Sequence, residues 1–252
     1  MIEAQKLTKR FHSRAGEIIA AREVSFSVSS KTIMGLLGPN GAGKTTILSI
    51  LATAQTPDSG VARVMNVDVA ENKELVRKQI GVLSDQRGLY SRLTTKENLL
   101  YYGMLYGISY KVLKNRIAYL CDALNLTSIE NRRTEGFSQG EKMKVAIARA
   151  LIHDPAVLLL DEPTNGLDVM SVRRLRLFLR ELRDQGKTII FSSHIMSEVA
   201  NVCDDIIVMN RGRVIAQGST DELWAGAEQL EEAFFAILEA DEKRMSAMGG
   251  NA

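Results

Sequence analysis

The 252-residue chain is 45% hydrophobic and 25% charged, proportions that are typical of a folded globular protein and exclude a disordered or fibrous one. Its 32 Lys and Arg residues nearly balance 30 Asp and Glu residues, so the net charge is +2 and no nucleic-acid partner is expected. Cys121 and Cys203 stand far apart with no CxxC spacing, which argues against a zinc site or a disulfide framework.

The N-terminal part of the chain predicts antiparallel strands followed by a strand, a loop and a helix. Residues 24–28 alternate apolar and polar side chains, the pattern of a half-buried strand. Residues 33–37 form a short apolar strand that leads into a glycine-rich loop, and residues 46–51 continue as a helix. Three later apolar runs also have the length of strands and are separated by helical sequence, namely 157–160, 188–191 and 206–209. Strands that alternate with helices predict a mainly parallel sheet.

A helical insertion is expected in the middle of the chain, at about residues 87–150. Within it, apolar residues recur at helical spacing over residues 94–126, with no convincing strand between them. The C-terminal residues also have a helical pattern. We therefore expect an α/β fold with an N-terminal antiparallel β subdomain and an inserted α-helical subdomain. Residues 1–220 would form one domain and residues 221–252 a C-terminal helical tail.

A phosphate-binding loop is predicted between the strand at 33–37 and the helix that follows it. The segment matches G-x-x-x-x-G-K-[ST], and its residues are Gly38, Pro39, Asn40, Gly41, Ala42, Gly43, Lys44 and Thr45. In such a loop, backbone N–H groups and the helix N-terminus bind phosphates, Lys44 neutralises phosphate charge, and Thr45 offers its hydroxyl to Mg²⁺. A glycine-rich turn without function does not explain the Lys-Thr pair between these flanks. ATP or GTP binding follows, and Thr46 completes the predicted nucleotide-binding set.

An acidic pair, Asp161 and Glu162, follows the apolar run at 157–160. Open α/β sheets bind ligands at the carboxyl ends of their strands, so we expect this pair beside the phosphate loop. Asp161 is expected to hold Mg²⁺, and Glu162 to polarise the attacking water as general base. The alternative is that the acids simply end a strand. His194 follows the run at 188–191 at the same edge, where its imidazole is expected to contact the γ-phosphate.

A second helix N-terminus is predicted at Ser138. The apolar residues that follow it recur at helical spacing from Met143 to Leu151. Ser138 and Glu141 also form the pattern of a capping box. That capping role is by itself a sufficient structural explanation of the segment.

In chain order, these motifs resemble those of the ATP-binding subunits of ATP-binding-cassette (ABC) transporters, over nearly the whole chain. The motifs that carry the resemblance are Gly38 to Thr45, Phe137 to Glu141, Asp161 to Asp168, and His194. The resemblance implies a P-loop NTPase core that binds and hydrolyses ATP with Mg²⁺.

The resemblance also implies further nucleotide contacts. Ser138, Gln139 and Gly140 would belong to the family's signature motif, which binds the γ-phosphate of ATP held by the other subunit. Asp168 would end the family's D-loop, and Phe11 would stack on adenine. A phenylalanine of the core is the alternative for Phe11. Many members have glycine where this chain has Gln139, but the serine and Gly140 remain, so we expect a competent motif.

The chain departs from the family pattern after the strand at 80–83. The family's Q-loop glutamine usually follows such a strand by two residues, and that position is Asp85 here, with Gln86 one place later. We expect Asp85 to occupy the site, because it keeps the usual spacing to Leu89 and a carboxylate can also ligate magnesium.

Residues 88–99 together with 137–140 resemble a bacterial subgroup similar to sodium exporters, whose subunits pair with a separate membrane protein. This implies an integral membrane permease as partner, a homodimer of ATP-binding subunits, and a place on the cytoplasmic face of the inner membrane. The cargo would be sodium or a drug-like solute. The rival hypothesis is a non-transport ABC ATPase that acts in DNA repair or on ribosomes, but the chain has neither a long coiled coil before the signature nor a second cassette.

Overall fold

Six strands form the central sheet in the order β10-β9-β3-β8-β7-β6. All neighbouring pairs are parallel except β9 and β10, which form an antiparallel hairpin. The computed structural model describes residues 1–13, 16–84, 88–224 and 230–249. The strands of this sheet are β3 (Ile33–Leu37), β6 (Ile80–Leu83), β7 (Val157–Asp161), β8 (Thr188–Ser193), β9 (Asp205–Asn210) and β10 (Arg213–Ser219).

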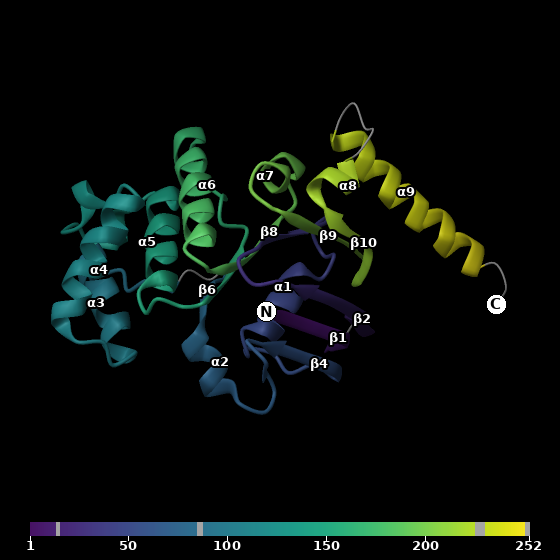
Figure 1. The fold of residues 1–252 in the computed structure, drawn as a ribbon, viewed down its shortest axis with the longest axis horizontal. Coiled ribbons are helices and arrows are strands. Elements are labelled where there is room, and N and C mark those ends of the chain that lie inside the picture. Colours follow the sequence, from purple (N-terminus) through teal and green to yellow (C-terminus); the bar gives the residue numbers. More distant parts are fainter. Residues whose placement is uncertain (14–15, 85–87, 225–229, 250–252) are drawn as a thin grey trace.

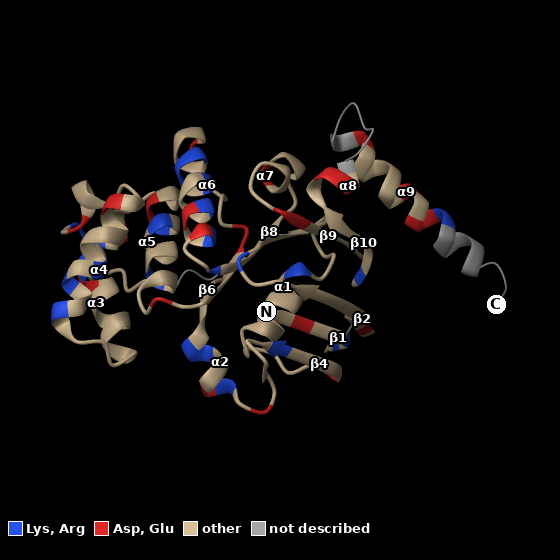
Figure 2. Ribbon diagram, in the orientation of Figure 1, with Lys and Arg blue, Asp and Glu red and all other residues tan. Residues whose placement is uncertain are grey.

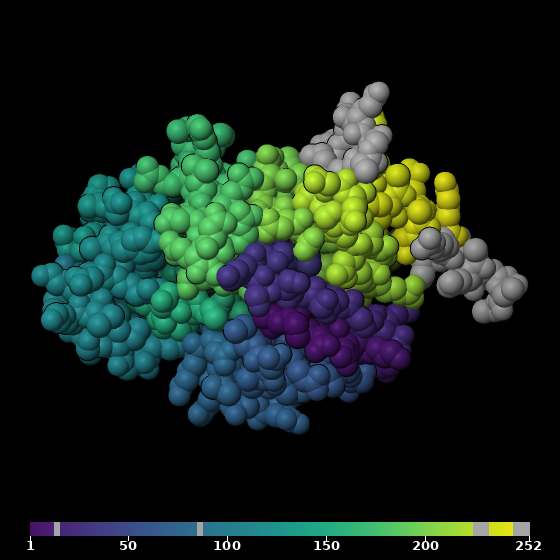
Figure 3. Space-filling view, in the orientation of Figure 1, coloured from purple at the N-terminus to yellow at the C-terminus, as the bar shows by residue number. Residues whose placement is uncertain are grey.

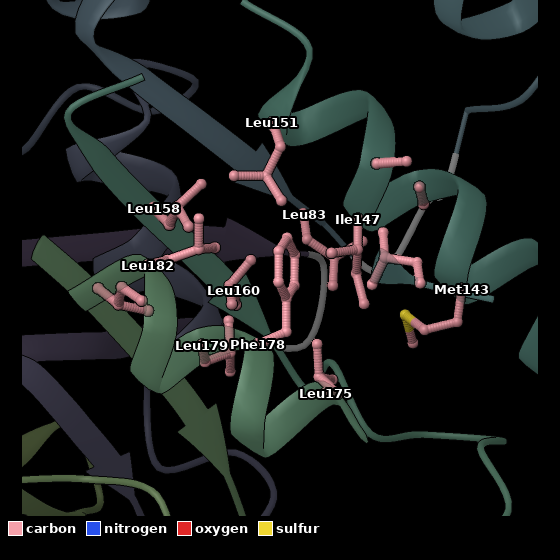
Figure 4. Packing of buried hydrophobic residues seen from close by; sticks show 14 of the residues in the cluster. Leu83, Met143, Ile147, Leu151, Leu158, Leu160, Leu175, Phe178, Leu179 and Leu182 are labelled. Carbon is pink, nitrogen blue, oxygen red and sulfur yellow. The ribbon is translucent and has the colours of Figure 1, made fainter. Parts of the chain in front are cut away.

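The sequences of the central strands are continuous apolar runs, because a hydrophobic core covers each face of the sheet. In β7, Leu158 and Leu160 pack into the core on the helical side, whereas Val157 and Leu159 pack into a second core on the opposite face. This alternation follows from the two-residue repeat of a strand. Figure 4 shows Leu158 and Leu160 beside Phe178, whose ring fills the space between the sheet and the surrounding helices.

The first core lies between the sheet and a group of helices (Figure 1). These helices are α3 (Thr95–Leu105), α4 (Tyr110–Ala123), α5 (Gln139–Leu151), α6 (Val169–Asp184) and α7 (Met196–Ala200). α3, α4 and the start of α5 form a helical lobe at one end of the molecule, which is the teal part of Figure 3. No helix in the described ranges is long and apolar enough to cross a membrane.

The second core lies between the central sheet and an N-terminal antiparallel sheet, with α1 (Lys44–Leu51) between them. The N-terminal sheet has the order β2-β1-β4-β5. Its strands are β1 (Ile2–Ser13), β2 (Gly16–Val28), β4 (Ser59–Val64) and β5 (Val67–Asp68). Helix α2 (Lys73–Gln79) leads from this sheet to β6.

The C-terminal residues form α8 (Thr220–Trp224) and α9 (Leu230–Gly249), at the right of Figure 1. α9 packs on β10 and α7, and it buries Phe234. The Asn210 amide at the end of β9 donates a hydrogen bond of 2.9 Å to Asp241 of α9. The tail is therefore attached to the hairpin formed by β9 and β10.

The predicted fold class is confirmed, because the strands expected at 33–37, 157–160, 188–191 and 206–209 are β3, β7, β8 and β9. The antiparallel N-terminal strands and the helical insertion are also present. α2, β4 and β5 were not predicted, because they are short elements with little periodicity.

Candidate functional site: a phosphate loop beside an acidic sheet edge

The strand order explains why residues distant in sequence meet at one edge of the sheet. β3, β8 and β7 are parallel neighbours in that order. The phosphate loop follows β3, His194 follows β8, and Glu162 follows β7. All three segments leave the carboxyl ends of adjacent strands, where open α/β sheets bind ligands. In Figure 2 the basic start of α1 and the acidic loop before α6 both lie near the middle of the molecule.

The phosphate loop curls tightly because its glycines adopt conformations that other residues avoid. Gly41 and Gly43 have φ values of 80° and 100°. A Cβ atom on Gly43 would lie 2.2 Å from the carbonyl oxygen of Ala20, so a side chain does not fit there. From the other side, the N–H of Gly212 in the β9–β10 turn donates a 3.0 Å hydrogen bond to the carbonyl of Ala42. The loop is thus held between β2 and the β9–β10 hairpin.

Lys44 is the buried cation of the site, with only 6% of the residue exposed. Its Nζ donates hydrogen bonds to the carbonyl oxygens of Gly38, at 2.7 Å, and Pro39, at 3.3 Å. The same nitrogen lies 3.6 Å from the Oε1 atom of Glu162. The ammonium therefore bridges the phosphate loop and the acidic sheet edge.

A chain of short hydrogen bonds joins Thr45, Asp161 and Ser192. The Thr45 hydroxyl donates to Oδ2 of Asp161 at 2.7 Å, and the Ser192 hydroxyl donates to Oδ1 of the same carboxylate at 2.6 Å. Asp161 is 6% exposed, and Ser192 is fully buried. Since both oxygens of Asp161 are engaged, the orientation of this carboxylate is fixed.

Glu162 and His194 form the outer part of the site. The Nδ1 atom of His194 lies 3.0 Å from Oε2 of Glu162. The backbone N–H of Glu162 donates a 3.0 Å hydrogen bond to the Ser192 hydroxyl. The Glu162 side chain is 19% exposed and that of His194 is 41% exposed, so water can reach both. A carboxylate beside an imidazole, both accessible, is able to accept and pass on the proton of an attacking water.

Lys44, Thr45 and Glu162 border a cavity of about 690 Å³. Its lining includes the phosphate loop from Asn40 to Thr46 and Glu162. Phe11 of β1 and residues 17–20 of β2 also line it. Phe11 is 38% exposed, and this placement differs from the alternative of a core phenylalanine. The volume and the mixed polar and aromatic lining suit a nucleotide.

The oxygen donors at the site fit a magnesium ion that is shared with phosphates. Thr45 and Asp161 supply a hydroxyl and a carboxylate side by side. Among the described residues there is no cluster of three or more His, Cys, Asp or Glu side chains that could hold a metal by themselves. Mg²⁺ commonly uses one or two protein oxygens and completes its shell with phosphates and water. Asp85 and Gln86, which we expect near this position, lie outside the described residues.

The segment that begins at Ser138 is placed differently. Ser138 accepts a hydrogen bond from the N–H of Glu141 at 3.1 Å, and the Glu141 carboxylate accepts one from the N–H of Ser138 at 2.7 Å. The predicted capping box is therefore present. Neither Ser138 nor Gln139 and Gly140 are among the residues that line the cavity of the same chain.

Asp168 lies at the start of α6, where its carboxylate caps the helix. It accepts hydrogen bonds from the N–H and the hydroxyl of Ser171, at 2.9 and 2.8 Å. The backbone hydrogen bond from Ser171 lowers the pKa of Asp168. Asp168 is also not among the lining residues of the cavity. Within one chain, the phosphate loop and the Ser138 segment are therefore separate anion-binding candidates.

Sequence reasoning missed several residues around the cavity. Ser192 joins the two acids, although its only signal is a polar residue at the end of a buried strand. Arg22 and Arg211 also line the cavity. No local pattern marks these arginines, because they reach the cavity through the packing of β2 and the β9–β10 turn.

Comparisons with known proteins agree with this geometry. A family model described as "ABC transporter" matches residues 21–165. The ABC transporter ATP-binding protein NatA of Bacillus subtilis is 42% identical over 241 residues, which cover 94% of this chain and 98% of NatA. The probable multidrug ABC transporter ATP-binding protein YbhF of Escherichia coli is 35% identical over 98% of this chain and 43% of its own length. The chain thus spans less than half of YbhF.

Solved structures of similar fold come from the same group of proteins. An ATP-binding subunit of an ABC transporter superposes with a TM-score of 0.85 at 27% identity, covering 94% of this chain and 99% of that chain. A dimeric ATP-binding cassette in a post-hydrolysis state, bound to ADP and Pi, superposes with a TM-score of 0.82 at 25% identity, over 87% of this chain and 99% of that one. The similarity to these structures extends over both the sheets and the helical lobe.

Proposed function

The chain belongs to the ABC transporter family, and on that premise we propose that it binds and hydrolyses Mg-ATP at the Lys44–Glu162 edge to drive transport through a separate permease. The observation that carries the proposal is that Lys44, Thr45 and Glu162 line one cavity. Asp161 is hydrogen-bonded to Thr45, and His194 lies 3.0 Å from Glu162. We further propose residues 1–220 as one ATP-binding domain with the helical insertion at about 87–150, and residues 221–252 as a C-terminal extension.

Each residue of the site has a distinct role in the proposed reaction. Lys44 and the loop N–H groups bind the β- and γ-phosphates. Thr45 and Asp161 hold Mg²⁺, which supplies charge neutralisation on the phosphate oxygens when it is bound. Glu162 accepts a proton from the attacking water, and His194 keeps the carboxylate oriented through their 3.0 Å contact. The remaining loop residues, with Phe11 on the adenine, position the nucleotide.

A head-to-tail dimer accounts for the second anion-binding segment. Ser138, Gln139 and Gly140 start a helix of thirteen residues, whose N-terminus suits an anion. Because they do not line the cavity of their own chain, we propose that they bind the γ-phosphate held by a second copy. Asp168 would lie at the same interface. The dimeric cassette among the similar structures supports this arrangement.

The cargo is proposed from the relatives. The Nod factor export ATP-binding protein I of Rhizobium sp., at 39% identity over 82% of this chain, supports export rather than import. Sodium remains the more specific proposal, with a drug-like solute as alternative. We also propose a place at the cytoplasmic face of the inner (plasma) membrane, where the chain would be held by the permease.

The permease is proposed to dock in a groove between α2 and the α3–α4 turn. The groove has a volume of about 390 Å³. It combines charged residues of α2, residues of the α3–α4 turn and a histidine that follows α5, namely Glu74, Arg77, Lys78, Leu105, Tyr106, Ile108 and His153. Leu105 is 65% exposed and Met104 beside it is 59% exposed. Neighbouring apolar side chains exposed to this degree favour a protein contact.

Isolation of the native complex from membranes tests the transport function. We expect the tagged chain to co-purify with an integral membrane protein and to retain ATPase activity. Recovery with ribosomes or DNA, and without a membrane protein, would contradict the proposal in favour of the non-transport alternative.

The docking groove has its own test with a matched control. Leu105→Glu places a charge in the apolar wall of the groove, so we expect the yield of co-purified permease to fall about tenfold while ATP binding by the chain is unchanged. Leu177→Glu changes a leucine of α6 that is 60% exposed and should leave the yield unchanged. Equal yields with both variants would place the docking surface elsewhere.

A further inference from the structure

We propose that Glu198 of α7 is a positioning residue for ATP hydrolysis, because it ties the segment after Glu162 to the strand end that carries His194. The inference rests on the proposed ATPase function, in which Glu162 and His194 act on the attacking water. Glu198 itself does not line the nucleotide cavity.

Two hydroxyl groups converge on one oxygen of Glu198. The Thr164 hydroxyl donates to Oε2 at 2.7 Å, and the Ser193 hydroxyl donates to the same atom at 2.8 Å. All three residues are buried, with exposures of 8% for Glu198, 5% for Thr164 and 0% for Ser193. Hydrogen bonds to a buried carboxylate are shorter and stronger than those between neutral groups, so this junction is rigid.

The burial of this carboxylate is costly and has no ionic compensation. No ion pair involving Glu198 occurs within the described part of the chain. Burying a charged side chain away from water is unfavourable unless polar groups bind it. The two hydroxyl donors meet that need. The carboxylate in turn accepts both hydroxyls and so holds these two segments together.

The two segments that Glu198 joins are those of the reacting groups. Thr164 lies two residues after Glu162, and the N–H of Asn165 donates back to the carbonyl of Glu162 at 3.2 Å. Ser193 directly precedes His194, and its hydroxyl also accepts a hydrogen bond from the N–H of Ile195 at 3.0 Å. Movement of Thr164 relative to Ser193 would therefore change the 3.0 Å contact between His194 and Glu162.

Two consecutive serines of β8 form hydrogen bonds on opposite faces of the strand. Ser192 binds Asp161 and the N–H of Glu162, whereas Ser193 binds Glu198 on the other face. Side chains of successive strand residues point to opposite faces. The strand end is thus fixed from both sides, and Glu198 supplies the fixation on the side away from the cavity.

The same segment also touches the start of α5. A Cβ atom on Gly140 would lie 2.8 Å from the carbonyl oxygen of Gly166, and one on Gly166 would lie 3.1 Å from Cβ of Gln139. Residues 163–168 therefore contact both Glu198 and the Ser138 helix N-terminus. Through this segment, Glu198 links the groups that act on water to the segment proposed to bind the second nucleotide of the dimer.

Four variants of the full-length chain test the inference by their kcat, their affinity for ATP and their thermal stability. Glu198→Ala should lower kcat about 10- to 100-fold, because small displacements of reacting groups have effects of this size. The Kd for ATP should stay within about twofold, since the phosphate loop is not attached to Glu198. Glu198→Gln should retain most of kcat, because the amide oxygen accepts the same two hydroxyls. Thr164→Val should lower kcat about tenfold without loss of ATP affinity.

Thr95→Val is the matched control for Thr164→Val. Thr95 is a fully buried threonine of the helical lobe whose hydroxyl has no partner within the described structure, so its loss should leave kcat and the Kd for ATP unchanged. If Glu198→Ala fails to fold, Thr164→Val decides the matter. The inference is overturned if kcat is unaffected, if kcat and ATP affinity fall together with the melting temperature, or if Glu198→Gln is as defective as Glu198→Ala.

The proposed function and this inference fail in different ways. A wild-type chain that does not hydrolyse ATP overturns both of them. A wild-type chain that hydrolyses ATP, with Glu198→Ala and Thr164→Val equally active, overturns the inference alone.

Discussion

Glu162 adopts a backbone conformation that is rare for a residue with a side chain. Its φ is 47°, in the left-handed region that costs energy outside glycine. The conformation is held by the hydrogen bond from its N–H to Ser192 and by the contact of its carboxylate with His194. Such strain is found at functional sites, and here it turns the carboxylate from the end of β7 toward Lys44.

The sequence marks the residues proposed to react, but it does not show how they support one another. Lys44, Asp161 and His194 each belong to a local pattern at the end of an apolar run. The bond from Ser192 to Asp161 joins residues 31 positions apart, and its formation depends on the parallel pairing of β7 and β8. Such contacts arise from strand order, which a local pattern does not encode.

Gly43 provides a test at the residue scale. Gly43→Ala should weaken ATP binding at least about tenfold, because the new Cβ would overlap the Ala20 carbonyl and displace the loop. Equilibrium binding of ATP measures the effect. Gly107→Ala is the control, since Gly107 has a similar φ of 75° but open space around its Cα. If both variants bind ATP like the wild type, the assigned geometry of the loop is wrong.

At the scale of elements, the α3–α4 turn and the segment after α5 meet at a stacked aromatic pair. The rings of Tyr106 and His153 lie 3.8 Å apart and are parallel within 1°. The Nε2 atom of His153 lies 2.9 Å from the Ile80 carbonyl, while the buried Nδ1 has no partner within the described structure. Burial lowers the pKa of His153, so the imidazole is held neutral between the helical lobe and the sheet.

This pKa shift predicts a pH dependence of stability. The folded state binds the His153 proton more weakly than the unfolded state, so the free energy of unfolding falls as the pH drops below about 6.5. Chemical denaturation at pH 7.5 and at pH 5.5 measures the difference. His153→Gln should show a smaller loss on acidification than the wild type, whereas replacement of the exposed His12 by Gln should not change it. If His153→Gln loses as much unfolding free energy on acidification as the wild type, His153 is not the source of the pH dependence.

The sequence was sufficient to predict elements with strong patterns and insufficient for the others. β3, β7 and β8 are short apolar runs buried on both faces, and the periodicity of α5 marks its buried side. Antiparallel strands are expected in the N-terminal part of the chain, but only residues 24–28 have a clear strand pattern. The bounds of β1 are not evident, because register shifts interrupt its pairing with β2 and hide its alternation.

At the scale of the whole molecule, each chain carries the phosphate loop and the Ser138 segment in separate places. In a closed two-fold dimer, the phosphate loop of each chain can face the Ser138 segment of its partner. Such a dimer would have two identical sites. Each site then requires a phosphate loop from one chain and a Ser138 segment from the other.

Mixing inactive variants tests this arrangement. Lys44→Ala and Ser138→Ala should each be inactive alone, because every site of either homodimer lacks one half. Mixed in equal amounts, they should recover about a quarter of the wild-type ATPase rate, since half of the dimers are mixed and each has one intact site. Lys44→Ala mixed with Asp161→Asn is the control and should not recover, because both changes fall in the same half. If the mixture of Lys44→Ala and Ser138→Ala recovers no ATPase activity, the shared site is contradicted.

The most direct test of the account is a paired measurement of ATP binding and ATP hydrolysis by the purified chain and its Glu162→Gln variant, with and without Mg²⁺. We predict that the wild type hydrolyses ATP when Mg²⁺ is present, and that Glu162→Gln binds ATP with similar affinity but hydrolyses it at least about 100-fold more slowly. Absence of ATP binding by the wild type, or unchanged hydrolysis by the variant, would contradict the meeting of the Lys44 loop and the acidic pair around one nucleotide.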